Sequence, residues 1–294
     1  MRIDLHTHSD RSDGTEPPGE LVRRANQHGI DVLAITDHDT TEGWDQAAEA
    51  ATNTGVTLVR GIEISCRFFG HGVHLLAYLP DPTYPPLAGE LDRILAGRNS
   101  RLPATLEMLR SLGIDIDVDD VRKVAGNTAA MGRPHVADAL VALGVVSDRG
   151  QAFARYLGPR GPAYVNRYAA DLTTMIRTVT EAGGVSVAAH PWASRHNHTA
   201  LDLAGFAALH EAGLAGIEVD HEDHDPETRE TLRAVAKDLD LVVTGASDHH
   251  GDGKVDHELG CNTTAPGELE RLLDLAAEAT RMSGRRTPEV LNAR

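Results

Sequence analysis

The sequence is poor in cysteine and in aromatic residues. Its 294 residues include only Cys66 and Cys261, too few for a fold held by several disulfides and typical of a protein from a reducing compartment. Aromatic residues make up 4% of the chain, which argues against an extended surface that stacks the bases of a long single strand. A mononucleotide or a short oligonucleotide end remains compatible with this composition.

The sequence also lacks long apolar runs and net positive charge. No apolar run approaches the roughly 18 to 20 residues of a membrane-spanning helix, and the N-terminus has no basic segment followed by an apolar stretch. We therefore expect a cytoplasmic protein without membrane association. The formal charge of -16 opposes stable binding to a nucleic-acid duplex. A small anionic substrate stays possible where bound metal neutralises local acid, and no feature indicates an obligate protein partner.

Strand-like and helical segments alternate in both the first and the last third of the chain. The strand-like runs are nearly all apolar, which is typical of parallel strands buried on both faces, so the pattern predicts an α/β fold. The seven expected strands are residues 3–6, 32–36, 56–59, 73–79, 185–189, 216–219 and 241–244. Helical patterns lie between most of them, and residues 266–282 are expected to form a closing amphipathic helix.

The middle of the chain has a different pattern. After a proline-rich stretch at residues 80–86, helical spacing recurs without convincing strands between the helices. The expected helices are residues 87–95, 102–112, 118–124, 135–143 and 151–157. We predict an inserted helical cap over residues 98–165, with residues 1–97 and 166–294 forming the barrel domain.

Metal-ligand residue types follow the expected strands. Side chains alternate along a strand, so His6 and His8 point the same way and can hold one ion together. The carboxyl ends of parallel strands share one face of a barrel, where sites are normally built. Six histidines and three carboxylates are therefore predicted to form a metal site there: His6, His8, Asp13, His38, Glu63, His74, His190, Asp248 and His250.

The kind and number of these donors indicate several ions. Nitrogen and oxygen donors without cysteine favour manganese, zinc or iron(II). Nine donors are too many for one such ion but suffice for two or three ions about 3.5 to 4 Å apart, and we expect Glu63 to bridge them. Three divalent ions would bring six positive charges, and the three carboxylates would bring three negative charges. The site would therefore be cationic and suited to phosphoryl oxygens.

The same residues resemble motifs of the polymerase and histidinol phosphatase (PHP) superfamily of metallohydrolases. The matching segments, which span nearly the whole chain, are Asp4-Leu5-His6-Thr7-His8, Ser12-Asp13-Gly14, Thr36-Asp37-His38, Gly61-Ile62-Glu63, His74, Ala189-His190-Pro191 and Ser247-Asp248-His249-His250. The resemblance implies a distorted seven-stranded β/α barrel with three divalent ions, manganese first and zinc or iron as alternatives. It also implies three ligand sets: His6, His8, Glu63 and Asp248; Glu63, His74 and His190; and Asp13, His38 and His250.

Two further segments resemble a branch with a helical insert, which includes nucleoside 3',5'-bisphosphate phosphatases and 5'-3' exoribonucleases. They are Gly132-Arg133-Pro134-His135 and Gly216-Ile217-Glu218-Val219 followed by His224. This likeness implies a phosphoesterase that removes the 3'-phosphate of nucleoside 3',5'-bisphosphates or degrades short RNA 5' ends, by attack of a metal-bridging hydroxide. Asp220, His249 and residues 192–198 depart from the branch pattern, at positions where they bear on substrate preference.

Several residues outside the ligand set are candidates for substrate contact. Arg133 suits a bidentate clamp on a second phosphate, although a salt bridge at a helix start would explain it too. His135 and His224 are candidate general acids or donors to a phosphate. Alternatively, His135 is only a residue of a helix start, and His224 lies in a solvated loop without a role. Arg195 is a weaker anion-binding candidate, and Asp37 and Asp39 are expected to orient His38.

Two alternative functions remain for the whole protein. They are hydrolysis of histidinol phosphate and the role of a non-catalytic metal-binding PHP module.

Overall fold

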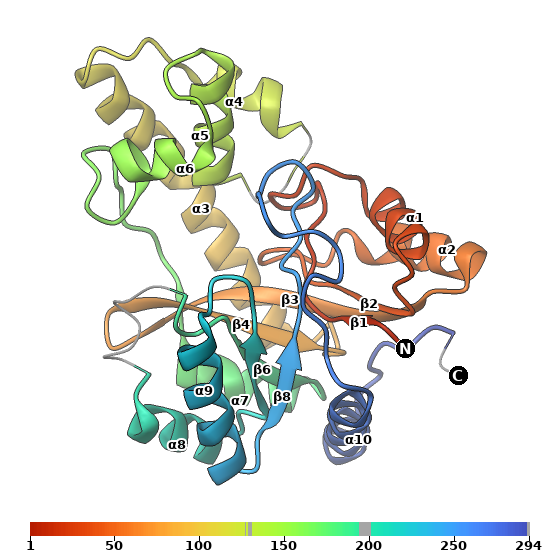
Figure 1. The fold of residues 1–294 in the computed structure, drawn as a ribbon. Helices are drawn as coiled ribbons and strands as arrows, with labels where there is room; N and C mark the ends of the chain where they lie inside the picture. Colours follow the sequence, from red (N-terminus) through yellow and green to blue (C-terminus); the bar gives the residue numbers. More distant parts are fainter. Residues whose placement is uncertain (127, 129–130, 194–200, 293–294) are drawn as a thin grey trace.

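The chain forms a curled, nearly closed sheet with helices around it and a separate group of helices to one side. Figure 1 shows the computed structural model, which describes residues 1–126, 128, 131–193 and 201–292. The strand order is β1-β2-β3-β4-β6-β7-β8, and the short strand β5 pairs with β3 outside this path. A bridge between Thr7 and His249, just beyond β1 and β8, brings the two edges of the sheet together. The predicted α/β barrel is confirmed.

The strand bounds are β1 (Ile3–Asp4), β2 (Val32–Ile35), β3 (Thr57–Phe68), β4 (His71–Tyr78), β5 (Ala170–Asp171), β6 (Val185–Ala189), β7 (Gly216–Asp220) and β8 (Val242–Gly245). Strand β4 is antiparallel to both of its neighbours, β3 and β6, whereas the other pairs are parallel. Only Phe69 and Gly70 connect β3 to β4, both with positive φ, and so short a link permits a hairpin but no parallel crossover. The parallel arrangement that the apolar runs indicated is therefore present in the other strands of the barrel but not at β4.

Helices cover the outside of this sheet and bury its apolar strands. They are α1 (Pro18–Gln27), α2 (Trp44–Thr54), α7 (Leu172–Glu181), α8 (Leu203–Glu211), α9 (Pro226–Asp238) and α10 (Pro266–Ser283). All residues of β2 and β6 are buried, as expected for strands covered on both faces. No helix among the described residues is long and apolar enough to cross a membrane.

The remaining helices gather beside the barrel, as Figure 1 shows. They are α3 (Pro85–Ser111), α4 (Val118–Ala125), α5 (Arg133–Ala142), α6 (Arg149–Ala152) and a π-helical turn over Phe153–Leu157. A separate hydrophobic cluster within this group runs from Leu102 to Ala163. Helix α3 is continuous where two helices were expected, because its polar middle stays helical while Arg98 and Arg101 are buried there. The predicted boundary at residue 98 thus falls inside one helix.

Candidate metal centre

The first group of ligand-type side chains lies at the end of β1. The Nε2 atoms of His6 and His8 face each other at 3.0 Å. Oδ1 of Asp248 lies 3.4 Å from the first of these nitrogens and 3.3 Å from the second. The paired orientation that we expected from the His-x-His spacing is present, and the three side chains are buried with their donor atoms converging.

Glu63 stands at the centre of the constellation. Its Oε2 atom lies 3.4 Å from Nε2 of His6, 3.2 Å from Nε2 of His8 and 3.0 Å from Nδ1 of His38. Its Oε1 atom faces the other way, 2.8 Å from Nδ1 of His74 and 3.0 Å from Nε2 of His190. A carboxylate with different histidines at each oxygen has the geometry of a bridging ligand.

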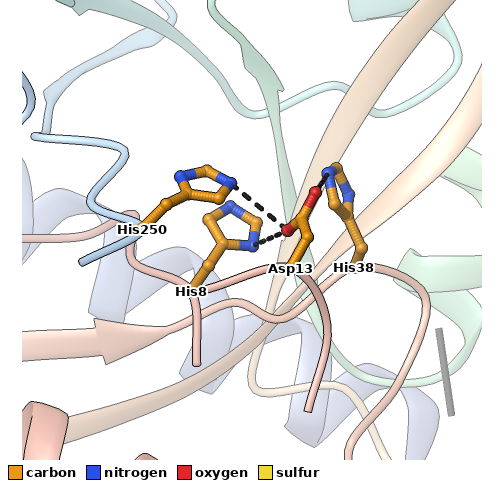
Figure 2. A group of neighbouring side chains, drawn as sticks. All are labelled: His8, Asp13, His38 and His250. Atoms are coloured by element: carbon orange, nitrogen blue, oxygen red, sulfur yellow. Dashed lines mark ion pairs between the residues drawn. The ribbon is translucent and has the colours of Figure 1, made fainter. Parts of the chain in front are cut away.

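Asp13 organises a further group, drawn in Figure 2 with His8, His38 and His250 around it. Its Oδ1 atom lies 3.3 Å from Nε2 of His250 and 3.7 Å from Nδ1 of His8. Oδ2 lies 3.6 Å from Nε2 of His38. Segments far apart in the sequence thus bring all nine predicted residues into one continuous cluster.

The chemistry of these donors fits divalent cations. Several groups of three or four residues have donor atoms within 4.8 Å of one another. Four buried atoms among them make no hydrogen bond, namely Asp13 Oδ1, His38 Nδ1, His74 Nδ1 and Asp248 Oδ1. Buried polar atoms without hydrogen bonds are costly, and a cation shared among such atoms removes the cost.

Contact with the surrounding histidines keeps the carboxylates of Glu63 and Asp13 ionised despite their burial. Burial alone would raise the pKa of Glu63 and of Asp13, but the surrounding histidines hold both pKa values well below the usual range. Burial lowers the pKa of His38 to about 4, which leaves its ring neutral and able to offer a lone pair. Ionised carboxylates and the neutral ring of His38 are in the form in which such side chains bind metal.

Glu218 is a supporting residue to which sequence reasoning gave no role. It is fully buried, and its carboxylate lies 3.0 Å from Nδ1 of His6 and accepts a hydrogen bond from the backbone N–H of His190 at 2.8 Å. His190 needs this support because its φ of 27° is unusual for a residue other than glycine. A charged residue between the apolar residues Ile217 and Val219 of β7 is the signal that could have identified it.

His221 supports Asp248 in a similar way. The backbone N–H of Asp223 donates to Nδ1 of His221, so Nε2 carries the proton and donates to Oδ2 of Asp248 at 3.3 Å. Lys254 contacts the same carboxylate oxygen at 2.5 Å. His221 lies in a hydrophilic stretch of sequence, which gave no signal of a buried role.

Asp37 and Asp39 have other tasks than the expected orientation of His38. Asp37 accepts hydrogen bonds from the backbone and hydroxyl of Ser9 and from the hydroxyl of Ser12, at 2.6 to 2.8 Å, and so orders the loop that carries Asp13. Asp39 accepts from Ser65 and forms an ion pair with Arg98 at 2.8 Å. Among the described residues, neither Asp37 nor Asp39 forms a hydrogen bond with His38.

Arg133 lies beside three other arginines where α3 and α5 meet the barrel. Its Nη1 donates to the carbonyl of Leu157 at 3.0 Å, and its guanidinium lies over the rings of Phe153 and Tyr164. Two neighbouring guanidinium groups approach Gly132, and a Cβ there would lie 3.2 Å from Arg98 and 3.7 Å from Arg101. We call Arg98, Arg101, Arg133 and Arg167 the arginine cluster.

The arginine cluster carries more charge than its surroundings neutralise. Burial, together with the other three arginines, lowers the pKa of Arg101 to about 9. Burial and the charge of Arg98 lower the pKa of Arg167 to about 10. Asp39 is the one carboxylate paired with the cluster among the described residues. Such a surplus of buried positive charge favours an anion.

The structure places the remaining candidates at different points. His135 is buried; its Nδ1 accepts from the backbone of Gly132, and it faces the seam between the helical group and the loop of Asp10 to Thr15. His224 donates from Nδ1 to the carbonyl of Val219 at 2.9 Å, and its buried Nε2 makes no hydrogen bond. Arg195 lies outside the described residues.

A cavity of about 750 Å³ opens over the cluster. Seven of the nine ligand-type residues line it, all except His6 and His8, and Arg149 and Lys254 line it too. Its size is in the range that encloses a nucleotide-sized ligand.

Comparisons with known proteins point to one family. The sequence model of the PHP domain matches residues 4–84. A 5'-3' exoribonuclease of Haemophilus influenzae is 37% identical over 85% of this chain and 90% of its own length. A 3',5'-nucleoside bisphosphate phosphatase of Chromobacterium violaceum is 34% identical over 90% of this chain and 92% of its own.

A solved structure gives the same result. A protein of Bifidobacterium adolescentis assigned as a metal-dependent phosphoesterase superimposes with a TM-score of 0.89 at 38% identity, covering 93% of this chain and 96% of its own. Fold, donor cluster and relatives together define a metal-dependent phosphoric ester hydrolase. The chain belongs to the PHP family, as its motifs indicated.

Proposed function

We propose that this phosphoesterase acts on nucleotides and removes the 3'-phosphate of nucleoside 3',5'-bisphosphates. The observation that carries the proposal is the position of the arginine cluster next to the metal-ligand residues. Asp39, which directly follows His38, forms an ion pair with Arg98. Ser65 contacts Arg98 and Arg167, and it is the register partner of His74 on the neighbouring strand β4. One phosphate at the ligand cluster and a second at the arginines would match a bisphosphate.

We assign three divalent ions to the nine ligand-type residues, with manganese first and zinc or iron as alternatives. Bound ions would supply Lewis-acid stabilisation of the phosphoryl oxygens and a more acidic water. The chain's own residues would set the geometry: Glu63 would bridge, Asp248 with His6 and His8 would hold one side, and Asp13 with His38 and His250 the other. His74 and His190 would complete the set at the second oxygen of Glu63.

Residues 98–165 would act as a substrate-facing cap on the barrel formed by residues 1–97 and 166–294. Arg133 would bind the second phosphate as a member of the arginine cluster. His135 suits a neutral donor, since its Nδ1 accepts from Gly132 and its Nε2 therefore carries a proton. His224 suits an acceptor more than an acid, because burial lowers its pKa and its Nε2 is unprotonated.

Hydrolysis at short RNA 5' ends is the second candidate, favoured by the identity to the exoribonuclease of Haemophilus influenzae. Both substrates are small phosphorylated nucleotides or chain ends and need no duplex-binding surface.

The two cysteines are free, which supports a reducing compartment, and we propose that the protein acts in the cytoplasm.

The test uses metal-analysed protein with manganese or zinc restored. It is offered adenosine 3',5'-bisphosphate, 5'-phosphorylated RNA oligomers and histidinol phosphate, and the products are identified. We expect metal-dependent release of inorganic phosphate and adenosine 5'-phosphate from the first substrate. Absence of turnover on every phosphoester would overturn the enzyme assignment, and turnover of histidinol phosphate alone would overturn the nucleotide assignment.

A pair of variants tests the site. His8→Ala removes a ligand of the buried cluster and should lower the rate by about 100-fold or more, because bound ions contribute several kcal/mol to such reactions. His28→Ala, at an exposed position after α1, is the matched control and should keep full activity. Full activity of the His8 variant would contradict the proposed site.

A further inference from the structure

The loop that carries Asp13 is held from the helical group as well as from the barrel. On the barrel side, Asp37 binds Ser9 and Ser12, as described above. On the other side, the hydroxyl of Thr128 lies 2.8 Å from the carbonyl oxygen of Arg11 and 2.9 Å from that of Ser12. Arg149 donates to the next carbonyl, that of Asp13 itself, at 3.3 Å. Three consecutive carbonyls of this loop thus accept hydrogen bonds from residues beyond the barrel.

Arg149 is itself held in one orientation. Its Nε and Nη2 atoms bind the two carboxylate oxygens of Asp138 on α5, at 2.5 and 2.6 Å. This bidentate pairing fixes the plane of the guanidinium and directs Nη1 at the barrel. The side chain is 16% exposed, so water competes little for these contacts.

The Nη1 atom bridges two loops. Besides the carbonyl of Asp13, it binds the carbonyl of Gly253 at 3.0 Å. Gly253 in turn donates its backbone N–H to the carbonyl of His250. A Cβ at position 253 would lie 2.3 Å from Nη1, so the close approach of Arg149 requires a glycine there. One nitrogen therefore ties together the backbones that place Asp13 and His250.

Those two residues belong to a single group of donors. Asp13 and His250 face each other at 3.3 Å and share their group with His8 and His38 (Figure 2). The other groups of the centre share His8 and His38 with this one and add His6, Glu63, His74, His190 and Asp248. Within the described part of the barrel, Arg149 binds only two backbone segments, the loop from His8 to Asp13 and the loop that follows Asp248 and His250, and it makes no contact with the segments of Glu63, His74 or His190. The effect of Arg149 on the centre is accordingly selective.

We propose that Arg149 is a positioning residue of the helical group that fixes Asp13 and His250 and thereby strengthens binding of one particular ion, the one held by His8, Asp13, His38 and His250. The inference rests on the proposed metal-binding function. Its consequence is that docking of the helical group and completion of the metal centre are linked through this guanidinium. Thr128 acts in the same direction on the two preceding carbonyls.

The test measures metal content per chain by elemental analysis at a series of buffered manganese or zinc concentrations. In Arg149→Gln we expect the midpoint for one ion to rise about 10- to 100-fold while the others bind as in the wild type. Arg149→Lys keeps the charge without the fork and should be intermediate. Thr128→Val should give a smaller shift of the same kind. Arg122→Gln removes an exposed arginine of α4 and serves as the control without effect.

Two results would overturn the inference. One is an unchanged midpoint for every ion in Arg149→Gln. The other is an equal weakening of all ions with a lower melting temperature of the metal-free variant, which would show a purely structural role. Wild-type protein that binds no divalent ion would overturn the proposed function and this inference together, so the two failures are distinguishable.

Discussion

Glu218 and His6 form a buried pair in which the carboxylate lies 3.0 Å from Nδ1 of the imidazole. Burial alone would raise the pKa of Glu218, but the charge of His6 and the hydrogen bond between them help lower it to about 2, so the carboxylate is ionised and can only accept. Nδ1 of His6 therefore carries a proton and donates it to Glu218 in a hydrogen bond. Its Nε2 atom points at the position shared with His8, Glu63 and Asp248, and loss of the Nε2 proton on metal binding would leave the tautomer that a metal ligand requires.

Replacing Glu218 with glutamine should weaken metal binding without removing any ligand. The amide lacks the charge that makes His6 more basic, so we expect about a 10- to 100-fold loss of metal affinity, measured by titration of metal-free protein. Glu230→Gln, at an exposed position on α9, provides the comparison and should bind as the wild type does. Equal affinities of the two variants would show that Glu218 does not tune His6.

Arg101 should destabilise the protein when no anion is bound. It is buried among Arg98, Arg133 and Arg167, and its depressed pKa means that its charge disfavours the folded state at neutral pH. Arg101→Met should raise the melting temperature by roughly 2 to 4 °C, the equivalent of about 1 to 2 kcal/mol in a domain of this size. The measurement is thermal unfolding of metal-free protein.

The same variant tests the anion site. Inorganic phosphate should raise the melting temperature of the wild type by binding the folded state, and this increase should be smaller in Arg101→Met. Arg122→Met, on the exposed face of α4, should retain the full increase. If phosphate stabilises both variants equally, the arginine cluster is not where it binds.

His224 should make the folded protein sensitive to mild acid. Burial lowers its folded-state pKa below the ordinary value near 6.5, so between these two pKa values the unfolded chain binds more protons than the folded one. The stability that neutral His224 provides is thus present above pH about 6.5 and decreases as the pH falls below it. Urea unfolding of metal-free His224→Gln at pH 7.5 and 5.5 should show a smaller pH difference than the wild type. An identical difference would mean that other groups account for the sensitivity.

The sequence allowed prediction of the ligand cluster because His6 and His8 follow a strand, and alternation along a strand is a local rule. The sequence also placed Glu63 in the site, but it did not show that β3 continues to Phe68 with Glu63 inside the strand, since the hairpin after β3 depends on the turn at Phe69 and Gly70. Arg98 and Arg101 were also missed as site residues. Their helical stretch looks like an ordinary solvated face, and only the docking of α3 on the barrel buries them.

Glu63 and His74 should differ in how much of the centre each one supports. Both oxygens of Glu63 face histidines, five in all, whereas His74 meets the centre through Oε1 of Glu63 and is 34% exposed. Glu63→Gln should therefore reduce metal content at more than one position, because it removes the negative charge that the ions would share. His74→Ala should remove no more than one ion and leave the others bound. Elemental analysis at saturating manganese separates the two, and a Glu63 variant that lost only as much metal as the His74 variant would show that Glu63 binds one ion and bridges none.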